Sequence, residues 1–340
     1  MKILYSIQAT GNGHISRAKE ILPYLKEYGE VDCMLSGDNS QLSTNDLPIK
    51  YRSKGLSFYY NSKGGIDYWK TILKFNPFRI YRDAKALPVE DYDIIINDYD
   101  PITSLACRLK KVKSVAIGNQ FAFLSEKTPR FKDANKFDRF IGELILKHLV
   151  TATRYVAFGY KAYDSFIYNP IIRKSIVEST PIEGEHILVY LPQYEDRMLI
   201  EVFNQITNLK FHLFSKTAKI SMDWGNVSVF SINAPNKMFD ISLINCKGVI
   251  TAGGFQLTSE ALYLGKRLMC IPIGGQYEQL CNAAALRNIG VYVDFYGILD
   301  DFRLYVYIMF TSPLISGRKI PLKYSTRELV NIIINEAIKN

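Results

Sequence analysis

The feature that most constrains the fold is an apolar run near the start of the chain that leads into a short glycine-rich loop. Residues 3–7 are largely apolar, and Gly11, Asn12, Gly13 and His14 follow them closely. An apolar run of this length before a glycine loop is typical of a buried parallel strand followed by a helix. The sequence therefore predicts an α/β domain at the start of the chain.

Short apolar segments alternate with helical or polar segments along the whole chain. In the first half, residues 31–35, 93–97 and 114–117 are predicted strands, and residues 16–28 a helix that Pro23 should kink. The aperiodic residues 179–185 contain Pro and Gly and are interpreted as a linker. Strands are predicted after it at residues 186–191, 210–214, 227–230, 248–251, 267–272 and 290–294. We expect two domains, 1–179 and 186–340, with a cleft between them and a closing helix at residues 325–339.

The composition argues against a membrane-spanning protein and against a secreted protein with disulfide bonds. The 340 residues are 48% hydrophobic, as in soluble proteins with sizeable cores. No uncharged apolar run approaches the roughly 18 residues of a membrane span, and the first apolar stretch is too short for a signal peptide. The five cysteines have no C-x-x-C spacing and are predicted to be buried, reduced thiols. We therefore expect a cytoplasmic protein, soluble or peripheral on the inner face of the cell membrane.

Residues 50–85 form a basic and aromatic segment. They hold nine basic and two acidic side chains, interleaved with nine aromatic ones. The segment is interpreted either as an aromatic core with solvated lysines or as a face that meets anionic lipid or a lipid-linked acceptor. Nucleic acid would suit the same chemistry but is not expected as a partner. The residues assigned to this acceptor or membrane face are Tyr68, Trp69, Lys70, Lys74, Phe75, Phe78 and Arg79.

A second glycine motif follows the strand predicted at residues 248–251. Gly253 and Gly254 come directly before a helix predicted to begin near Leu257. The exposed amides of such a helix start attract a phosphate, and glycines let the ligand approach the backbone closely. The carboxylate of Glu260 can accept two hydrogen bonds from a ribose diol, although the helix dipole alone would also favour an acid there.

These residues carry a family resemblance. The pattern G-G-x-x-x-T-S-E-A-L, followed by P-I-x-x-x-x-E-Q-x-x-N-A, resembles the donor-nucleotide signature of GT-B glycosyltransferases, as in the UDP-glycosyltransferases. The loop G-N-G-H is similar to the G-x-G-H loop of family 28, which includes the enzyme that adds N-acetylglucosamine to the lipid-linked peptidoglycan precursor. The resemblance implies two Rossmann-like domains facing a central cleft. It also implies a nucleotide-sugar substrate, expected to be a UDP-sugar, and neither a metal nor another cofactor.

The resemblance assigns a set of residues to the donor. Glu260 is expected on the ribose, and Gly254, Thr258 and Ser259 near the diphosphate. Glu278 and Gln279 are expected on the hydroxyls of the donor sugar, with Asn282 supporting that loop. Ala252 departs from the histidine that many plant-type relatives have, and residues 190–194 are not glycine-rich as in family 28. The full donor-binding set is Gly253, Gly254, Thr258, Ser259, Glu260, Glu278, Gln279 and Asn282.

The glycine loop of the first domain carries a histidine where the helix should begin. A dinucleotide site needs G-x-G-x-x-G and an acid about 20 residues later, but Ser16 stands at the third glycine position. Asp32 or Asp38 would have to supply that acid. In the transferase interpretation, His14 is the general base for an acceptor hydroxyl, because an imidazole has an ordinary pKa of about 6.5. The alternative is a histidine that only bonds the backbone.

A catalytic imidazole usually has an orienting partner. Asp98 ends a predicted buried strand and resembles the aspartate that holds the catalytic histidine in UDP-glycosyltransferases, with Asp100 as the alternative. The sequence Asp98-Tyr99-Asp100 is also similar to the D-x-D motif of metal-dependent GT-A transferases. We therefore expect an inverting, metal-independent glycosyltransferase with a small-molecule or lipid-linked acceptor. A sugar-nucleotide 2-epimerase of the same fold and a non-catalytic nucleotide-sugar or lipid-binding protein remain as alternatives.

Overall fold

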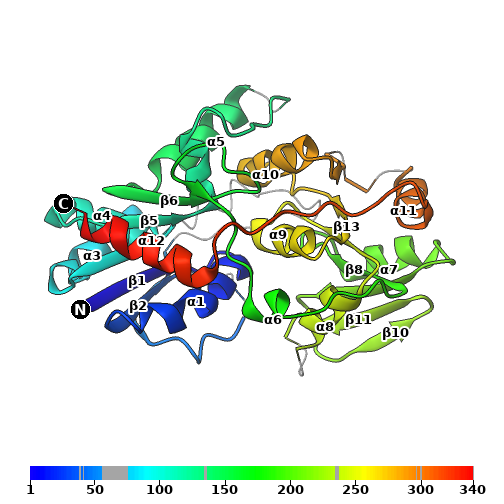
Figure 1. The fold of residues 1–340 in the computed structure, drawn as a ribbon, viewed down its shortest axis with the longest axis horizontal. Coiled ribbons are helices and arrows are strands. Elements are labelled where there is room, and N and C mark those ends of the chain that lie inside the picture. The colour runs from blue at the N-terminus through cyan, green and yellow to red at the C-terminus, as the bar shows by residue number, and fades with distance from the viewer. Residues whose placement is uncertain are drawn as a thin grey trace.

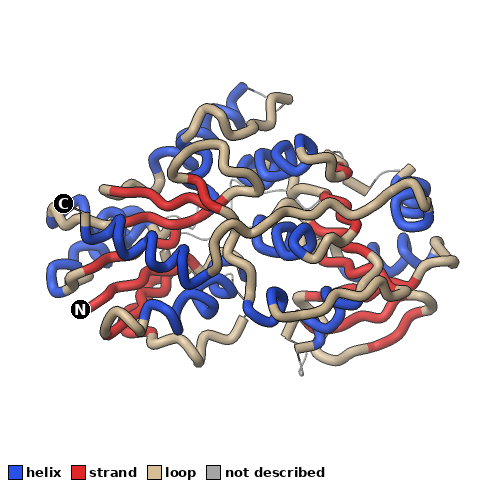
Figure 2. The backbone as a smooth tube through the Cα atoms, viewed as in Figure 1, coloured by secondary structure: helices blue, strands red, loops and turns tan. Residues whose placement is uncertain are grey.

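Two parallel β-sheets form the centres of two lobes in the computed structural model (Figure 1). The N-terminal lobe is built on the first sheet and the C-terminal lobe on the second, as the two groups of red strands in Figure 2 show. The structure describes residues 1–37, 40, 42–55, 76–133, 136–233, 237–295, 297–298 and 301–339.

The N-terminal sheet has the strand order β3-β2-β1-β4-β5-β6-β7, and its strands are parallel. Its central strands β1 and β4 are largely apolar, and every residue except Lys2 is buried, as a sheet covered by helices on both sides requires. The bounds are β1 Lys2–Gln8, β2 Glu30–Ser36, β3 Ile49–Ser53, β4 Ile94–Asp98, β5 Val115–Gly118, β6 Arg154–Phe158 and β7 Ile167–Tyr168.

The C-terminal sheet repeats this plan with the order β10-β11-β9-β8-β12-β13-β14. Only the pairing of the edge strand β10 with β11 is antiparallel among the described strands of this sheet. The bounds are β8 His186–Tyr190, β9 Lys210–Ser215, β10 Met222–Trp224, β11 Val227–Ser231, β12 Gly248–Thr251, β13 Arg267–Cys270 and β14 Tyr292–Val293. Each predicted strand is therefore present, with ends that differ from the prediction by one or two residues.

The helices pack on the faces of the two sheets (Figure 1). Those of the first half are α1 Asn12–Leu25, α3 Pro77–Ala86, α4 Pro101–Lys110, α5 Lys136–His148 and α6 Lys174–Val177, with the short 3₁₀ helices η1 Val89–Asp91 and η2 Asn119–Leu124. Those of the second half are α7 Asp196–Asn204, α8 Met238–Asn245, α9 Phe255–Tyr263, α10 Tyr277–Asn288, α11 Phe302–Thr311 and α12 Thr326–Ile338.

Helix α12 packs on the N-terminal lobe, which differs from the expected division into 1–179 and 186–340. It contacts α1 and the strands β4, β5 and β6, and in Figure 1 it lies, in red, beside the blue helix α1. A capping box of Ser325 and Glu328 starts the helix, and its apolar side, which includes Ile333, is buried. The chain therefore crosses between the lobes a second time before it ends.

Two further expectations can be compared with the fold. Helix α1 begins at Asn12 rather than at residue 16, so His14 lies in its first turn, and the helix continues past Pro23 to Leu25. All five cysteines are free and buried, as predicted. Within the described ranges, no helix combines the length and the apolar content that a membrane span requires.

Candidate active site

A cavity of about 450 Å³ lies between the two lobes. It opens where the strand order of each sheet reverses, between β1 and β4 in one lobe and between β8 and β12 in the other. Ligands of doubly wound α/β sheets bind at the carboxyl ends of strands at such a reversal. The cavity lining includes His14 of the N-terminal lobe and Gly254, Glu260 and Glu278 of the C-terminal lobe.

The glycine loop of α1 reaches across the cleft to the other lobe. Gly11 precedes the helix in an extended conformation, and no side chain caps the helix start. A Cβ atom on Gly13 would lie 3.4 Å from the Cβ of Gln256 in α9, and the amide of Asn12 donates to the hydroxyl of Tyr190 at 3.3 Å. The loop therefore brings the start of α1 against the start of α9.

His14 and Asp98 form the pair that the sequence predicted. The Nδ1 atom of His14 lies 2.7 Å from Oδ1 of Asp98, and the His14 side chain is 12% exposed. Asp98 ends β4 beside Ile7 of β1, which brings its carboxylate under the first turn of α1. Because Nδ1 faces Asp98, the opposite ring nitrogen, Nε2, is the one available to a ligand in the cavity.

Arg17 completes this cluster and was missed by the sequence analysis. Its Nε donates to Oδ2 of Asp98 at 2.8 Å, and its Nη2 donates to Oδ1 at 2.5 Å. Burial raises the pKa of Asp98, but the charges of Arg17 and His14 outweigh burial and lower this pKa to about 2. Asp98 is therefore ionised at neutral pH. The signal that could have revealed Arg17 is its spacing of three residues from His14, which places both on one helix face.

Asp100 has a structural role instead. Its carboxylate caps α4 by accepting from the amides of Ile102 at 3.3 Å and Thr103 at 2.8 Å, and it also accepts from the hydroxyl of Ser36. Both acids of the D-x-D-like sequence are thus engaged by protein donors. Among the described residues, no group of three or more His, Cys, Asp or Glu side chains could hold a metal ion.

Glu260 borders the cavity, but its carboxylate is already paired. It accepts from Nε of Arg173 at 2.8 Å, from Nη2 of Arg173 at 2.7 Å and from Nε2 of Gln256 at 2.8 Å. Arg173 also pairs with Asp240 of α8. Arg173 lies far from Glu260 in the sequence, so no spacing indicated this pair. A ribose hydroxyl could donate only to those lone pairs of the Glu260 carboxylate that Arg173 and Gln256 do not use. Otherwise it would have to displace one of these two donors.

The structure differs from the expectation at Thr258 and Ser259, whose side chains do not line the cavity. Both residues are buried, and the Thr258 hydroxyl contacts the carbonyl of Gly254 at 2.9 Å and the hydroxyl of Tyr160 at 2.7 Å. Helix α9 begins at Phe255, two residues before the expected start, so Thr258 and Ser259 do not occupy its first positions. Gln256 and Leu257 line the cavity in their place.

Gln279 and Asn282 brace the Gly253–Gly254 turn. Oε1 of Gln279 accepts from the amides of Gly253 at 3.0 Å and Ile273 at 3.2 Å, and the amide of Asn282 donates to the carbonyl of Gly253 at 3.0 Å. A Cβ atom on Gly253 would lie 2.7 Å from the carbonyl oxygen of Gln279, so this position needs glycine. Asn282 therefore supports the turn before α9, a contact that the sequence did not indicate.

Glu278 joins the lobes across the cleft. Its carboxylate accepts from the side-chain amides of Asn119 at 2.9 Å and Gln120 at 3.2 Å, and both residues belong to η2 of the N-terminal lobe. Its carboxylate therefore lies at the boundary of the two lobes, where the expected donor sugar would lie.

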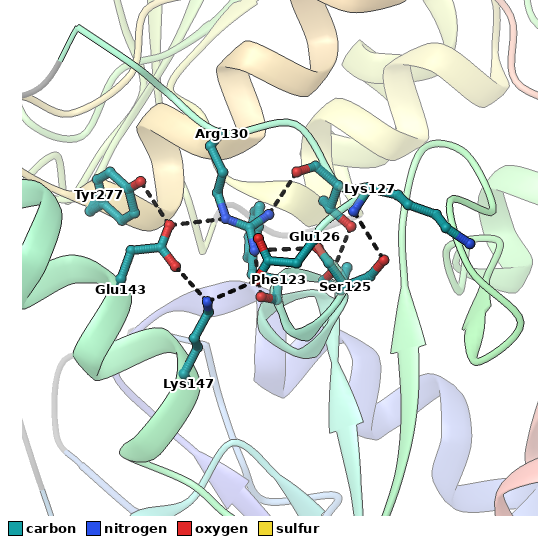
Figure 3. A network of polar contacts seen from close by, with 10 residues as sticks. Phe123, Ser125, Glu126, Lys127, Arg130, Glu143, Lys147 and Tyr277 are labelled. Carbon is teal, nitrogen blue, oxygen red and sulfur yellow. Dashed lines mark hydrogen bonds and ion pairs between the residues drawn. The ribbon is translucent and has the colours of Figure 1, made fainter.

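A second contact between the lobes lies beside Glu278 (Figure 3). The Tyr277 hydroxyl of α10 donates to Glu143 of α5 at 2.9 Å, and Arg130 donates to the same oxygen at 3.0 Å. A Cβ atom on Gly142 would collide with the Tyr277 ring. Helices α5 and α10 therefore pack in direct contact.

Little of the proposed acceptor or membrane face belongs to the described part of the chain. Tyr68, Trp69, Lys70, Lys74 and Phe75 lie outside the described residues. The other two are on α3, where the Phe78 side chain is 86% exposed and Asn76 caps the helix by accepting from the Arg79 amide at 2.9 Å.

Comparison with known proteins identifies the family of the chain and proteins with a similar fold. The sequence profile described as Glycosyl transferase family 1 matches residues 1–305. A comparison with curated protein sequences finds no match. The fold is similar to the GT-B fold of solved glycosyltransferases over nearly the whole chain.

Three solved structures illustrate this similarity. LpCGTa in complex with UDP has a TM-score of 0.59 at 12% identity, over 99% of this chain and 94% of that one. The spinosyn forosaminyltransferase SpnP has a TM-score of 0.57 at 12% identity, with the same coverage. The glycosyltransferase VinC in complex with dTDP has a TM-score of 0.53 at 14% identity, over 99% of this chain and 95% of that one.

Proposed function

Because the chain belongs to glycosyl transferase family 1 and is a glycosyltransferase, we propose that it moves a sugar from a nucleotide-sugar to an acceptor hydroxyl, with inversion and without a metal. The observation that carries the proposal is that His14 and the start of α9 line one cavity from opposite lobes. An acceptor hydroxyl and a donor diphosphate can therefore be held in the same space.

His14 acts as the general base in this mechanism. The Asp98 carboxylate accepts a hydrogen bond from Nδ1–H, so Nε2 holds the lone pair that takes the proton of the acceptor hydroxyl. The hydroxyl oxygen then forms a bond to the anomeric carbon from the face opposite the leaving group. The bond from that carbon to the diphosphate oxygen breaks, and its electron pair leaves with the diphosphate. Attack from the opposite face inverts the anomeric centre.

The start of α9 receives the charge of the departing diphosphate. The first amides of a helix have no partner within the helix, and the helix dipole favours an anion there. Gly254, without a side chain, leaves its backbone open, because a Cβ atom there would have no atom within 4 Å. Lys216 and Lys237 line the same cavity and add positive charge, and burial lowers the pKa of Lys216.

A pyrimidine nucleotide is the proposed leaving group. The relatives LpCGTa and VinC hold UDP and dTDP, which supports a UDP- or dTDP-linked donor for this chain. Glu260 is proposed to contact the ribose and Glu278 and Gln279 the sugar, as the resemblance implies. The similarity to family 28 in particular stays a prediction.

A lipid or lipid-linked acceptor is proposed from the basic aromatic segment 50–85, with the enzyme in the cytoplasm at the membrane surface. Phe78 and Tyr81 are 86% and 51% exposed on α3, beside the exposed Arg82. Co-sedimentation with vesicles containing anionic phosphatidylglycerol tests this proposal. Binding that is lost in Phe78→Ala/Arg82→Ala supports it. Equal recovery with and without anionic lipid contradicts it.

The base assignment is tested by His14→Ala. Turnover with a UDP-sugar and an acceptor should fall by about 10²- to 10⁴-fold, because the acceptor hydroxyl loses its base. The affinity for UDP, measured by calorimetry, should be unchanged. His148→Ala is the matched control, because His148 is exposed at the end of α5. Unchanged turnover in His14→Ala would remove the assignment.

Two further outcomes separate the alternatives. Conversion of UDP-N-acetylglucosamine without any acceptor would favour the 2-epimerase. Retained affinity for UDP without transfer across a panel of acceptors would favour a binding protein.

A further inference from the structure

Arg17 is a buried charge inside the proposed catalytic cluster. Its side chain is 3% exposed, and it binds both carboxylate oxygens of Asp98 through Nε and Nη2. The Nη2 atom also lies 2.9 Å from Nδ1 of His14. The Asp98 carboxylate is thus shared between an imidazole and a guanidinium, and this sharing affects both the tautomer and the charge of His14.

Nδ1 of His14 faces a donor and an acceptor at once. Asp98 Oδ1 lies at 2.7 Å and Arg17 Nη2 at 2.9 Å from this nitrogen. A ring nitrogen either donates or accepts, and an ionised carboxylate only accepts. A guanidinium only donates, but Nη2 of Arg17 already donates to Asp98, and Asp98 is the nearer partner of Nδ1, so we assign the proton to Nδ1. In the other tautomer Nδ1 would accept from Arg17, and Nε2 would carry the proton and could not act as a base.

The two neighbours have opposite effects on the protonated ring. A carboxylate at hydrogen-bond distance stabilises an imidazolium, whereas a guanidinium at a similar distance destabilises it. We propose that Arg17 is a positioning residue that balances the charge of Asp98, so that His14 keeps the Nδ1–H tautomer with Nε2 able to accept a proton. The significance of this balance for catalysis rests on the proposed base role of His14.

The balance has a consequence for each turnover. The proton taken from the acceptor must leave His14 before the next cycle, and a carboxylate without a counterion would retain it. The charge of Arg17 makes it easier for His14 to release this proton. The Asp98 carboxylate still accepts the hydrogen bond from Nδ1–H.

The other charged and titratable groups near His14 come from several elements. Tyr5 of β1 donates to Oδ2 of Asp98 at 3.2 Å, and Glu278 of α10 interacts electrostatically with Arg17. Arg173, Glu260, Lys216 and Lys237 line the same cavity. These groups are the same in all the variants below, so differences between variants report on Arg17 and Asp98.

The proposal is tested by ¹⁵N nuclear magnetic resonance of the histidine rings, without any substrate. The chain has four histidines, and His14→Ala identifies the signal of His14. In Arg17→Gln, the midpoint of the His14 titration should rise by about one pH unit or more, because Asp98 is no longer neutralised. In Arg17→Lys, which keeps the charge, the midpoint should stay close to that of the wild type. An unchanged midpoint in Arg17→Gln would overturn the proposal, and so would an equal rise in both variants.

A double variant keeps the test valid if Arg17→Gln does not fold. Asp98→Asn should lower the midpoint, because only the guanidinium remains, and Asp98→Asn/Arg17→Gln should return it close to that of the wild type. A double variant no different from Asp98→Asn would overturn the proposal.

The pH profile of kcat/KM then connects this balance to transfer. In Arg17→Gln, the acid limb should move to higher pH by the same amount as the ring titration. A shift of the ring without a shift of the acid limb would leave the charge balance intact but contradict the base role of His14. The two proposals therefore fail in different ways.

Discussion

At the scale of single residues, the candidate site depends on buried ion pairs that join distant parts of the chain. Asp98 is paired with Arg17, and Glu260 with Arg173. A charge in a low-dielectric interior costs several kcal/mol unless it is paired, so both partners of each pair are needed to keep the site folded. The same pairs fix where each carboxylate points.

The Arg173–Glu260 pair predicts a measurable loss of stability. Arg173→Met leaves Glu260, which is 1% exposed, without its main partner and should lower the free energy of unfolding by about 3 kcal/mol in urea denaturation. Combining it with Glu260→Leu should recover part of this loss, because the unpaired charge is then gone. Arg197→Ala is the control and should cost under about 0.5 kcal/mol, since its pair with Glu201 is exposed. Equal losses in the two single variants would contradict this interpretation of the pair.

A histidine pair in the C-terminal lobe predicts how stability depends on pH. The rings of His186 and His212 stack with centroids 3.7 Å apart, and burial, with the neighbouring His186, lowers the pKa of His212 to about 4. The unfolded chain, with an ordinary histidine pKa of about 6.5, then binds more protons than the folded chain between pH 6.5 and 4. Stability is therefore lost as the pH falls through this window.

His212→Gln tests this dependence, because it removes the titrating ring. The decrease in Tm between pH 7.5 and pH 5 should be smaller in this variant than in the wild type, whereas His148→Gln, at an exposed position, should behave as the wild type. A wild-type decrease that His212→Gln does not reduce would show that other groups cause the acid sensitivity.

At the scale of helices and strands, sequence patterns located most elements but not their partners. Apolar runs such as residues 3–7 and 248–251 predict strands because burial on both faces requires continuous apolar side chains. Helix starts are encoded less strongly: α9 begins at Phe255, two residues before the expected start, and its N-cap residue Gly254 provides no side-chain cap. The lobe against which α12 packs depends on long-range contacts that no local pattern contains.

Because local patterns do not contain long-range contacts, only some of the site residues could be predicted from the sequence. His14 and Asp98 stand at strand and loop ends, where parallel topology brings them together, so their pairing follows from the fold. Arg173 lies 87 residues from Glu260, and nothing local distinguishes it from a surface arginine.

The packing of α5 on α10 predicts that Gly142→Ala lowers the stability of the protein, although it would stabilise an isolated helix. Gly142→Ala should stabilise an isolated helix by about 1 kcal/mol, yet here the new Cβ meets the Tyr277 ring, and the protein should lose about 1 to 3 kcal/mol. In a Tyr277→Gly background, which removes the ring and also the Tyr277 Cβ that would lie 2.5 Å from the new atom, the same substitution should instead be stabilising. Urea denaturation of the four proteins measures both effects. Stabilisation by Gly142→Ala in the wild-type background would contradict the direct packing of the helices.

At the scale of the whole molecule, the two lobes supply different parts of one site. The N-terminal lobe contributes the imidazole and its charged partners, and the C-terminal lobe contributes the helix start and the acids that border the cavity. Contacts such as those of Glu278 with Asn119 and Gln120 hold the lobes together across the cleft. Neither lobe alone contains the proposed base and the proposed diphosphate site.

The crystal structure of the protein with UDP tests this account most directly. We expect the diphosphate to lie at the start of α9, against the amides near Gly254, with Nε2 of His14 facing the space beyond the β-phosphate where the sugar would be. Density for UDP outside this cavity, or a His14 ring turned away from the diphosphate, would contradict the proposed transfer.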